Sequence, residues 1–467
     1  MSQSFFWYDL ETFGRDPRFD RIAQFAGIRT DLDLNIIDDP VELFCRPSPD
    51  YLPDPVACTI TGITPQHCLE VGMSEADFAE RIARELSQPG TCTVGFNSLR
   101  FDDEFIRNLF YKNLLDPYAR EWQNQNSRWD LLDVVRAFRA LRPGDIVWPT
   151  TEDGRPSNKL ELLSAANGLA HDHAHDAVSD VIATIEVAKR LKQSSPKLFD
   201  YAFKLRDKRV VTEMMEQSYG RLLLHVSGRA PAAREHTTLI SPICPHPSGQ
   251  GAWIVADVCA APQSWWHDDP EVLRSRLYAK AEALGDSPRP PIKVLRANRC
   301  PFIATPKVLG ERAQTLGIDL AAAESNLNAL LALNPTQCLS TVFDDPPHNS
   351  SGDVDSRLYG GFIGKRDRAA LESVREALLF EPVDVTFDDP RLPELIFRYR
   401  AKNAPEMLGE QEMQRWMQHC IDKLNGDKPS NLTLCQFDDI LSTLDPTENI
   451  AKSLGDYRNA LCEHLGL

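Results

Sequence analysis

The first 195 residues alternate short apolar segments with amphipathic ones, and this alternation restricts the fold more than any other feature. Segments rich in β-branched and aromatic residues predict four strands, at 5–12, 21–33, 39–47 and 91–97. Segments with a helical period predict five helices, at 74–88, 102–115, 129–142, 159–169 and 176–191. Three strands followed by strand and helix alternation predict an α/β domain with a mixed sheet covered by helices.

The remaining residues predict two further domains, in line with about 150 residues per domain. Short strands, such as those expected at 221–227 and 251–258, and many prolines indicate a β-rich middle domain with inserted helices. Residues 343–356 are rich in Pro, Ser, Gly and Asp and form the expected linker. Amphipathic segments after it predict a helical C-terminal domain, with helices at 367–379, 393–408, 410–425 and 449–465. The expected domains are 1–195, 196–345 and 346–467.

The composition indicates in which cellular compartment such a chain is expected. No apolar run approaches the ~20 residues that a membrane span needs, so no membrane association is expected. The N-terminus has no basic leader and soon meets acidic residues, which argues against a signal peptide. The 11 cysteines are an odd number without a CxxC pair. We therefore expect reduced, mostly buried thiols and a cytoplasmic protein.

The charge distribution leaves two interpretations open. A formal net charge of −17 argues at first against a nucleic-acid partner. Residues 271–312, however, contain nine Lys or Arg against four acidic residues. This basic strip either guides a polyanion along a groove or is a solvated charged surface.

The segment "YDLET" places two carboxylates on one face of the first strand. Asp9 and Glu11 are two residues apart, so both point to the same side of the sheet. Buried carboxylates this close repel one another unless a cation lies between them, and hard divalent cations prefer oxygen ligands. An acidic pair on an apolar strand therefore predicts a metal site, although D-x-E alone is weak evidence.

A second acidic position follows the fourth strand. Asp102 and Asp103 stand where a helix should begin, and aspartate is favoured there as an N-cap or first-turn residue. One of them can cap the helix while the other reaches a metal ion. The site is then expected at the C-terminal edge of the sheet.

The run "HDHAHDAVSD" at 171–180 supplies the third position. If a helix begins near Asp176, its buried stripe contains Ala177, Val181, Ile185 and Ala188, with Asp180 at the edge of the stripe beside the sheet. His175 precedes this helix, whereas His171 and His173 lie further out. A zinc site made of the three histidines is the alternative, but structural zinc prefers thiolates or more widely spaced ligands.

Together these motifs resemble the DEDDh group of 3′→5′ exonucleases. "YDLETFG", "GFNSLRFDDEF" and "HDAVSD" match its three motifs in order. "CTITGITPQ", "NSRWDLLDVVRA", "LRPGDIVWP", "LYGGF" and "FRYRAKNAPEML" resemble the bacterial exonuclease I family over nearly the whole chain. The resemblance implies an RNase H-like exonuclease domain, an SH3-like middle domain and a helical C-terminal domain, which together hold single-stranded DNA.

The resemblance also implies a role for each site residue. The expected metal ligands, for two Mg²⁺ ions or, as the alternative, Mn²⁺, are Asp9, Glu11, Asp102 and Asp180. His175 is expected to deprotonate the attacking water, since a neutral imidazole suits that role near pH 7. Glu11, Thr12 and Phe13 are expected to hold the terminal nucleotide, which leaves as a 5′-mononucleotide.

DNA contacts are expected from residues that can stack on bases or bind phosphate. The expected contacts are Arg107, Tyr118, Trp122, Arg136 and Lys159, whereas Trp129 is expected in the core. The family implies a second partner, single-stranded DNA-binding protein, whose acidic C-terminal tail would dock at Arg142 and Tyr201. A monomer is expected.

Two functional hypotheses of different classes follow. The first is a Mg²⁺-dependent, processive 3′→5′ exonuclease that degrades single-stranded DNA in repair and recombination. The second is a non-catalytic DNA clamp, which would have no need for all four acids. Within the enzyme class, an RNA-trimming or proofreading exonuclease is the alternative, and the domains after residue 195 argue against it.

Overall fold

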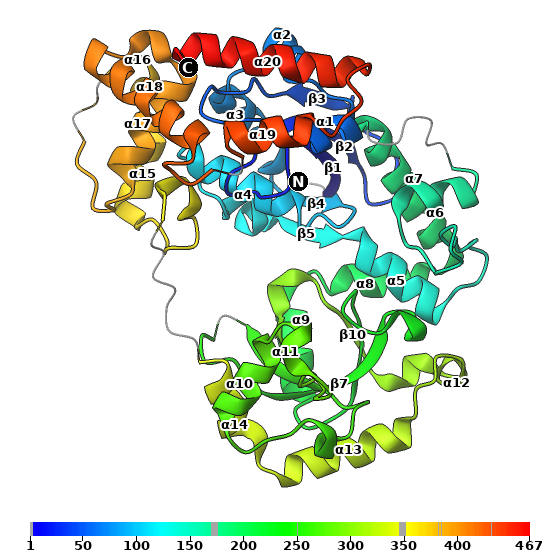
Figure 1. The fold of residues 1–467 in the computed structure, drawn as a ribbon. Helices are drawn as coiled ribbons and strands as arrows, with labels where there is room; N and C mark the ends of the chain where they lie inside the picture. The colour runs from blue at the N-terminus through cyan, green and yellow to red at the C-terminus, as the bar shows by residue number, and fades with distance from the viewer. Residues whose placement is uncertain are drawn as a thin grey trace. The chain divides into compact units, whose positions relative to one another are not determined.

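The computed structural model describes residues 3–169, 176–249, 251–344, 352–381, 383, 385–430 and 432–467. These residues form two compact units (Figure 1). Unit 1 contains residues 1–127, 171–184 and 349–467, and unit 2 contains residues 128–170 and 185–348. These two units do not test the two boundaries between the three expected domains, which stay predictions.

The N-terminal region forms the expected mixed sheet. Its strand order is β3-β2-β1-β4-β5. β1 (Ser4–Thr12) pairs antiparallel with β2 (Ile22–Thr30), which pairs antiparallel with β3 (Val41–Phe44), and β4 (Thr91–Gly95) runs parallel to β1. All four expected strands are confirmed, and the antiparallel and parallel pairs together make an RNase H-like mixed sheet.

In the described part of the N-terminal region, one strand and two α-helices were not expected. β5 (Ser127–Asp130) occupies the first residues of the segment expected as a helix at 129–142, and α5 (Leu131–Leu141) begins only after it. The Asp130 carboxylate accepts a hydrogen bond from the Leu132 amide, so Asp130 caps α5. The missed helices, α1 (Pro55–Thr61) and α2 (Pro65–Val71), are too short for a periodic pattern.

The two faces of β1 have different neighbours. Phe6, Tyr8 and Leu10 belong to one hydrophobic cluster with residues of α3 (Glu75–Leu86) and α4 (Asp102–Lys112). Because strand side chains alternate, Asp9 and Glu11 point to the opposite face. The same strand thus anchors the core with one face and presents carboxylates on the other.

The remaining helices of this region match the expected segments. α6 (Leu160–Ala166) and α7 (Ala177–Ser194) occupy the two segments expected as helices. The expected buried stripe of α7 is confirmed, since Ala177, Val181, Ile185 and Ala188 are each at most 1% exposed. α7 therefore presents Asp180 from its first turn, beside its buried stripe.

Unit 2 contains the β-rich middle domain, which is SH3-like. Its strands are all antiparallel, in the order β10-β6-β7-β8-β9. They are β6 (Leu223–Val226), β7 (Thr237–Pro245), β8 (Ala252–Asp257), β9 (Ile292–Arg296) and β10 (Phe302–Ala304). The helices are α8 (Pro196–Lys204), α9 (Lys208–Gln217), α10 (Pro270–Tyr278), α11 (Ala281–Leu284), α12 (Arg312–Thr315), α13 (Leu320–Ala332) and α14 (Pro335–Val342).

The C-terminal region is helical, as expected. Its helices are α15 (Lys365–Val374), α16 (Ala377–Phe380), α17 (Leu392–Asn403), α18 (Glu410–Asn425), α19 (Leu434–Leu441) and α20 (Asn449–Leu465). The segment expected as one helix at 367–379 is divided between α15 and α16. Within unit 1, Trp416 and Leu454 share a hydrophobic cluster with Phe13 and Tyr51. Residues 345–351 of the expected linker lie outside the described residues.

Two compositional expectations can be compared with the structure. None of the 11 cysteines, all of which lie in the described part, forms a disulfide, and seven of them are buried. Within the same part of the chain, no helix combines the length and the apolarity that crossing a membrane requires.

We predict that Trp129→Ala lowers the free energy of unfolding by about 3–5 kcal/mol, because it removes a large core side chain. Trp129 is 2% exposed and packs edge-to-face against Phe199 and Phe203, with ring centroids 5.2 and 5.1 Å away. Urea denaturation measures the change. Trp122→Ala is the matched control, since Trp122 is 62% exposed and its loss should change stability little. Equal effects of the two substitutions would contradict the assignment of Trp129 to the core.

Candidate active site

Three of the expected acidic residues lie together in unit 1. Asp9 and Glu11 come from β1, and Asp180 comes from the first turn of α7. Each offers a carboxylate oxygen, and these three oxygens lie within 4.8 Å of one another. Residues far apart in the sequence therefore form one acidic cluster.

The electrostatics of this cluster fit a divalent cation. Burial, with the neighbouring Asp180 carboxylate, raises the pKa of Asp9 well above its usual value. Burial also raises the pKa of Glu11, to about 9, with further contributions from Asp9 and Asp180. A cation between these carboxylates offsets their mutual repulsion, so that they can be ionised at the same time. Oxygen is the ligand atom that Mg²⁺ and Ca²⁺ prefer.

Asp102 is buried beside β1 but does not belong to the close group of three. It is the first residue of α4 and is 4% exposed, and its charge contributes to the raised pKa of Tyr8 on β1. Asp102 and Asp103 are both first-turn residues of α4, as one of the two expected positions requires, but neither caps the helix, because the N-cap position is Phe101 and no side chain caps it. Asp103 instead accepts hydrogen bonds from Tyr8 and Arg120.

The expected general base, His175, lies outside the described residues, as do His171 and His173. The residues directly after it are described. The Asp176 carboxylate accepts hydrogen bonds from the Ser179 amide at 3.0 Å and the Ser179 hydroxyl at 2.9 Å. The hydrogen bond from the Ser179 amide satisfies one of the backbone N–H groups at the start of α7, so Asp176 helps to fix where the helix begins. The start of the helix in turn places Asp180 in the first turn.

Thr12 and Phe13, expected at the terminal nucleotide, are both buried. The Thr12 hydroxyl donates a hydrogen bond to the Gly14 carbonyl at 2.6 Å. Phe13 is 1% exposed and packs near Tyr51, with ring centroids 6.3 Å apart. In this conformation Phe13 is a core residue, and its ring has no exposed face for a nucleotide.

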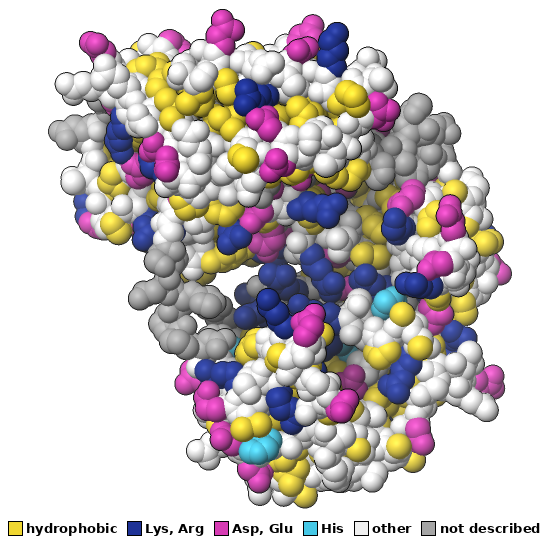
Figure 2. Space-filling view, in the orientation of Figure 1, with side chains coloured by type: hydrophobic (Ala, Val, Ile, Leu, Met, Phe, Trp, Pro, Cys, Tyr) yellow, Lys and Arg dark blue, Asp and Glu magenta, His cyan; other side chains and the backbone are white. Residues whose placement is uncertain are grey.

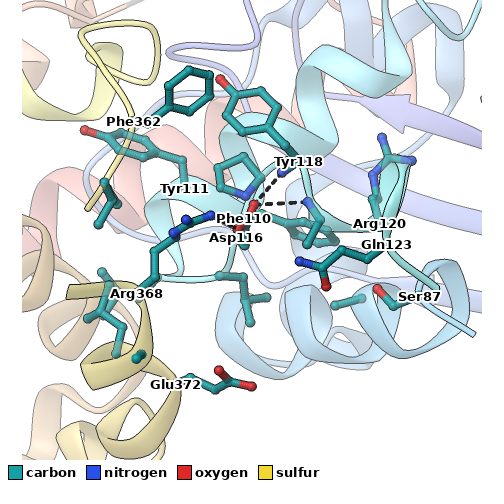
Figure 3. Close-up of a pocket in the computed structure, with 18 of the residues that line it drawn as sticks. Ser87, Phe110, Tyr111, Asp116, Tyr118, Arg120, Gln123, Phe362, Arg368 and Glu372 are labelled. Atoms are coloured by element: carbon teal, nitrogen blue, oxygen red, sulfur yellow. Dashed lines mark hydrogen bonds and ion pairs between the residues drawn. The ribbon is translucent and has the colours of Figure 1, made fainter. Parts of the chain in front are cut away.

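A cavity of about 650 Å³ in unit 1 is lined by two of the expected stacking residues (Figure 3). Tyr118 and Trp122 line it, and the Tyr118 ring meets Phe362 edge-to-face, with centroids 5.5 Å apart. Phe362 is 77% exposed. Phe362 had no expected role, although it belongs to the segment "LYGGF", which carried part of the resemblance.

The expected phosphate contacts differ in their accessibility. Arg107 is buried, and its guanidinium pairs with Glu121 at 2.7 Å and Glu104 at 2.8 Å. Lys159 keeps 68% of its side chain exposed, 3.3 Å from Glu161. Arg136 pairs with Asp133 at 2.5 Å. Of these three, only Lys159 is largely open to solvent.

The two residues expected to bind a partner lie in unit 2. Arg142 is exposed, and its guanidinium donates a hydrogen bond to the Leu141 carbonyl at 2.5 Å. Tyr201 is half-buried beside Phe302, and its hydroxyl donates to the Ile303 carbonyl at 2.8 Å. Unit 2 therefore presents the exposed guanidinium of Arg142 and the half-buried ring of Tyr201, and their role in binding a partner stays a prediction.

The basic strip is partly structural. Four of its arginines donate hydrogen bonds to backbone carbonyls of unit 2, namely Arg274, Arg276, Arg289 and Arg312. Over the lower part of this unit in the view, acidic and basic side chains are interspersed (Figure 2). For these four residues the structure favours a packing role over a continuous groove for a polyanion.

Comparisons with known proteins agree with this architecture. Three family models match the chain in order: the exonuclease model at residues 6–188, the exonuclease I SH3-like domain at 206–345 and the exonuclease I C-terminal domain at 352–460. Exodeoxyribonuclease I of Escherichia coli (strain K12) is 44% identical over 425 residues, or 89% of each chain. The chain belongs to the exonuclease I family. Membership in this family identifies it as an enzyme, an exonuclease.

Solved structures of the exonuclease I family superpose on the whole chain. The zinc-bound form of the E. coli exonuclease I complex with single-stranded DNA has a TM-score of 0.93 and 40% identity, and the match covers 99% of this chain and 100% of that one. A complex of SSB and exonuclease I with the inhibitor CFAM has a TM-score of 0.90 and 39% identity, with coverage of 99% and 100%.

We predict that a divalent cation displaces protons from this site at neutral pH. Glu11 has a pKa of about 9 in the folded, metal-free protein, against about 4.3 in an unfolded chain. Between about pH 4.3 and about pH 9 the folded protein therefore retains a proton that the unfolded chain has lost, and the free energy of unfolding falls as the pH rises through this range. A cation binds the ionised carboxylates and thereby restores the stability that is lost as the pH rises.

Isothermal titration calorimetry at pH 7, in buffers with different ionisation enthalpies, measures the protons that Mg²⁺ releases. The release should decrease as the pH approaches 9, and Mg²⁺ should raise the melting temperature more at pH 8 than at pH 5. Glu11→Gln is the control and should release fewer protons. Mg²⁺ binding at pH 7 without proton release would contradict the prediction.

Proposed function

We propose that this chain is a Mg²⁺-dependent, processive 3′→5′ exonuclease that degrades single-stranded DNA to 5′-mononucleotides. The observation that carries the proposal is the acidic cluster, in which Asp9, Glu11 and Asp180 offer oxygens within 4.8 Å of one another. Membership in the exonuclease I family supplies the reaction type. The match of relatives over all three regions supports a single-stranded DNA substrate.

In this proposal four carboxylates hold two Mg²⁺ ions, and Mn²⁺ can replace them. Asp9, Glu11 and Asp180 supply the close group, and the buried Asp102 supplies the fourth carboxylate. When bound, the two ions stabilise negative charge on the attacking and leaving oxygens of an in-line displacement. His175 accepts the proton of the attacking water, for which a neutral imidazole is suited near pH 7.

The DNA strand is held by aromatic and basic side chains. Trp122 and Tyr118 supply stacking surfaces at the 650 Å³ cavity. Arg107 acts through Tyr118, because its guanidinium lies 5.5 Å from the centroid of that ring. Lys159 and Arg136 contact phosphates, and Glu11, Thr12 and Phe13 hold the terminal nucleotide. Phe13 must leave the core for that role.

The remaining proposals concern partners and context. Arg142 and Tyr201 are the proposed docking residues for the acidic C-terminal tail of single-stranded DNA-binding protein, and the solved complex of SSB and exonuclease I supports such a partner. We propose a cytoplasmic monomer that acts in DNA repair and recombination. The proposed domains are 1–195, 196–345 and 346–467.

Two alternative functions have less support. A non-catalytic clamp would not require three carboxylates within 4.8 Å of one another, two of them with strongly raised pKa values. An RNA-trimming or proofreading exonuclease accounts for the first domain alone. The matches to the exonuclease I SH3-like and C-terminal domains favour single-stranded DNA.

We predict that the protein with Mg²⁺ shortens 5′-labelled single-stranded DNA from its 3′ end and that EDTA stops the reaction. His175→Ala should lower kcat about 10²-fold or more while largely preserving DNA affinity, because it removes only the proton acceptor. His171→Ala and His173→Ala are the matched controls and should retain activity. A ladder that persists in EDTA would contradict the metal site, and equal losses for the three histidines would support a histidine cluster.

We predict that Trp122→Ala weakens binding of single-stranded DNA by about 1–3 kcal/mol, because it removes a stacking surface. Fluorescence anisotropy in EDTA measures binding without turnover. Phe380→Ala is the control, since Phe380 is also an exposed aromatic residue but does not line the cavity. Unchanged affinity of Trp122→Ala would exclude Trp122 from the DNA site.

A further inference from the structure

A buried hydrogen-bonded group lies on the face of β1 opposite the acidic cluster. The Tyr8 hydroxyl donates to Asp103 Oδ1 at 2.7 Å, and Arg120 Nη2 donates to the same oxygen. The side chains of Arg120 and Asp103 are 0% and 1% exposed. Arg120 also donates to the Thr93 hydroxyl, at 3.4 Å. The group joins β1, β4 and α4 to the short helix η1 (Ala119–Glu121).

Two members of this group are chain neighbours of the proposed metal ligands. Tyr8 directly precedes Asp9 on β1, and Asp103 directly follows Asp102 on α4. The Tyr8–Asp103 hydrogen bond therefore connects β1 and α4 one residue away from a ligand on each element. The side chains of Tyr8 and Asp9 alternate across the strand, so this connection lies on the face of β1 opposite the acidic cluster.

The charges of the group fit a structural connection rather than a substrate contact. Arg120 neutralises Asp103, which would otherwise be an unpaired buried carboxylate. The fully buried guanidinium cannot reach phosphate in solvent. Burial raises the pKa of Tyr8, as does the Asp103 charge, so the hydroxyl retains the proton that it donates.

Figure 3 shows Arg120 among the residues that line the cavity, to the right of Tyr118 in this view, whereas Phe362 lies to the left of Tyr118. Tyr118 and Trp122 are two residues before and after Arg120, and both line the cavity. The segment that presents the proposed stacking residues is thus fixed to the sheet by Arg120.

We propose that Tyr8, Asp103 and Arg120 form a latch that positions Asp102 relative to Asp9 and Glu11 for cation binding. Arg120 and Tyr8 are positioning residues, since both hydrogen-bond to Asp103 and act through it on the neighbouring residue Asp102. The proposal rests on the metal site of the proposed function. The latch acts by fixing the distance between β1 and the start of α4, and neither Tyr8 nor Asp103 has to gain or lose a proton.

The first test uses Tyr8→Phe, which removes one hydroxyl and no charge. Mn²⁺ binding is measured without DNA by electron paramagnetic resonance, and melting temperature is measured in EDTA. Tyr8→Phe should weaken Mn²⁺ binding about 10-fold or more, as the loss of partners behind metal ligands generally does. Tyr111→Phe is the matched control, because Tyr111 is equally buried at 2% exposure and donates one hydrogen bond, to the Val354 carbonyl at 3.0 Å.

The outcomes separate the latch from the metal site itself. If Tyr111→Phe keeps the affinity of the unsubstituted protein while Tyr8→Phe loses it, the latch is supported. Equal Mn²⁺ affinities of the unsubstituted protein and Tyr8→Phe would overturn the latch and leave the proposed function intact. If the unsubstituted protein binds no Mn²⁺, the metal site of the proposed function fails first and the latch fails with it.

A second variant separates positioning from stability. Arg120→Met combined with Asp103→Leu replaces the buried ion pair with apolar groups, a change that often preserves stability. It removes one positive and one negative charge, so the net charge near the acids is unchanged. The latch predicts weaker Mn²⁺ binding, again about 10-fold or more, at a similar melting temperature. Unaltered Mn²⁺ affinity in the folded double variant would overturn the proposal.

Discussion

The mutual repulsion of closely spaced carboxylates is the constraint on which the site depends. Asp9 and Glu11 lie on a strand whose other face is packed in the core, so both carboxylates are held on the same face of the strand. Their raised pKa values show that the metal-free protein holds them in an unfavourable environment. The packing of β1 and α7 must therefore supply enough stability to keep these acids in place until a cation binds.

The parts of this site that follow from local periodicity could be predicted from the sequence. The period of two places Asp9 and Glu11 on one face of β1, and the helical period places Asp180 beside the buried stripe of α7. The four strands of the mixed sheet that have clear apolar patterns were predicted correctly for the same reason. β5 was missed because its four residues, including Asp130, lack an alternating pattern.

The features that depend on tertiary partners could not be predicted. Arg107 has the composition of a phosphate contact, but Glu104 and Glu121 surround its guanidinium in the fold. The burial of Trp129 also depends on packing, but here the expectation of a core residue is confirmed, whereas the 62% exposure of Trp122 leaves its role as a DNA contact a prediction. Asp103 was expected to act as a cap or a first-turn residue, since the sequence contains no signal that Tyr8 and Arg120 converge on it.

The latch links two requirements that an exonuclease of this kind has to meet together. Stacking residues must be exposed, and an exposed segment is held in place only by contacts made elsewhere along it. η1 meets this requirement by burying Arg120 while Trp122 remains in solvent. The buried guanidinium needs a carboxylate partner, and Asp103, beside Asp102, is that partner. The latch therefore predicts that substitutions at Asp103 affect the position of the proposed stacking segment and the position of Asp102, a proposed metal ligand, at the same time.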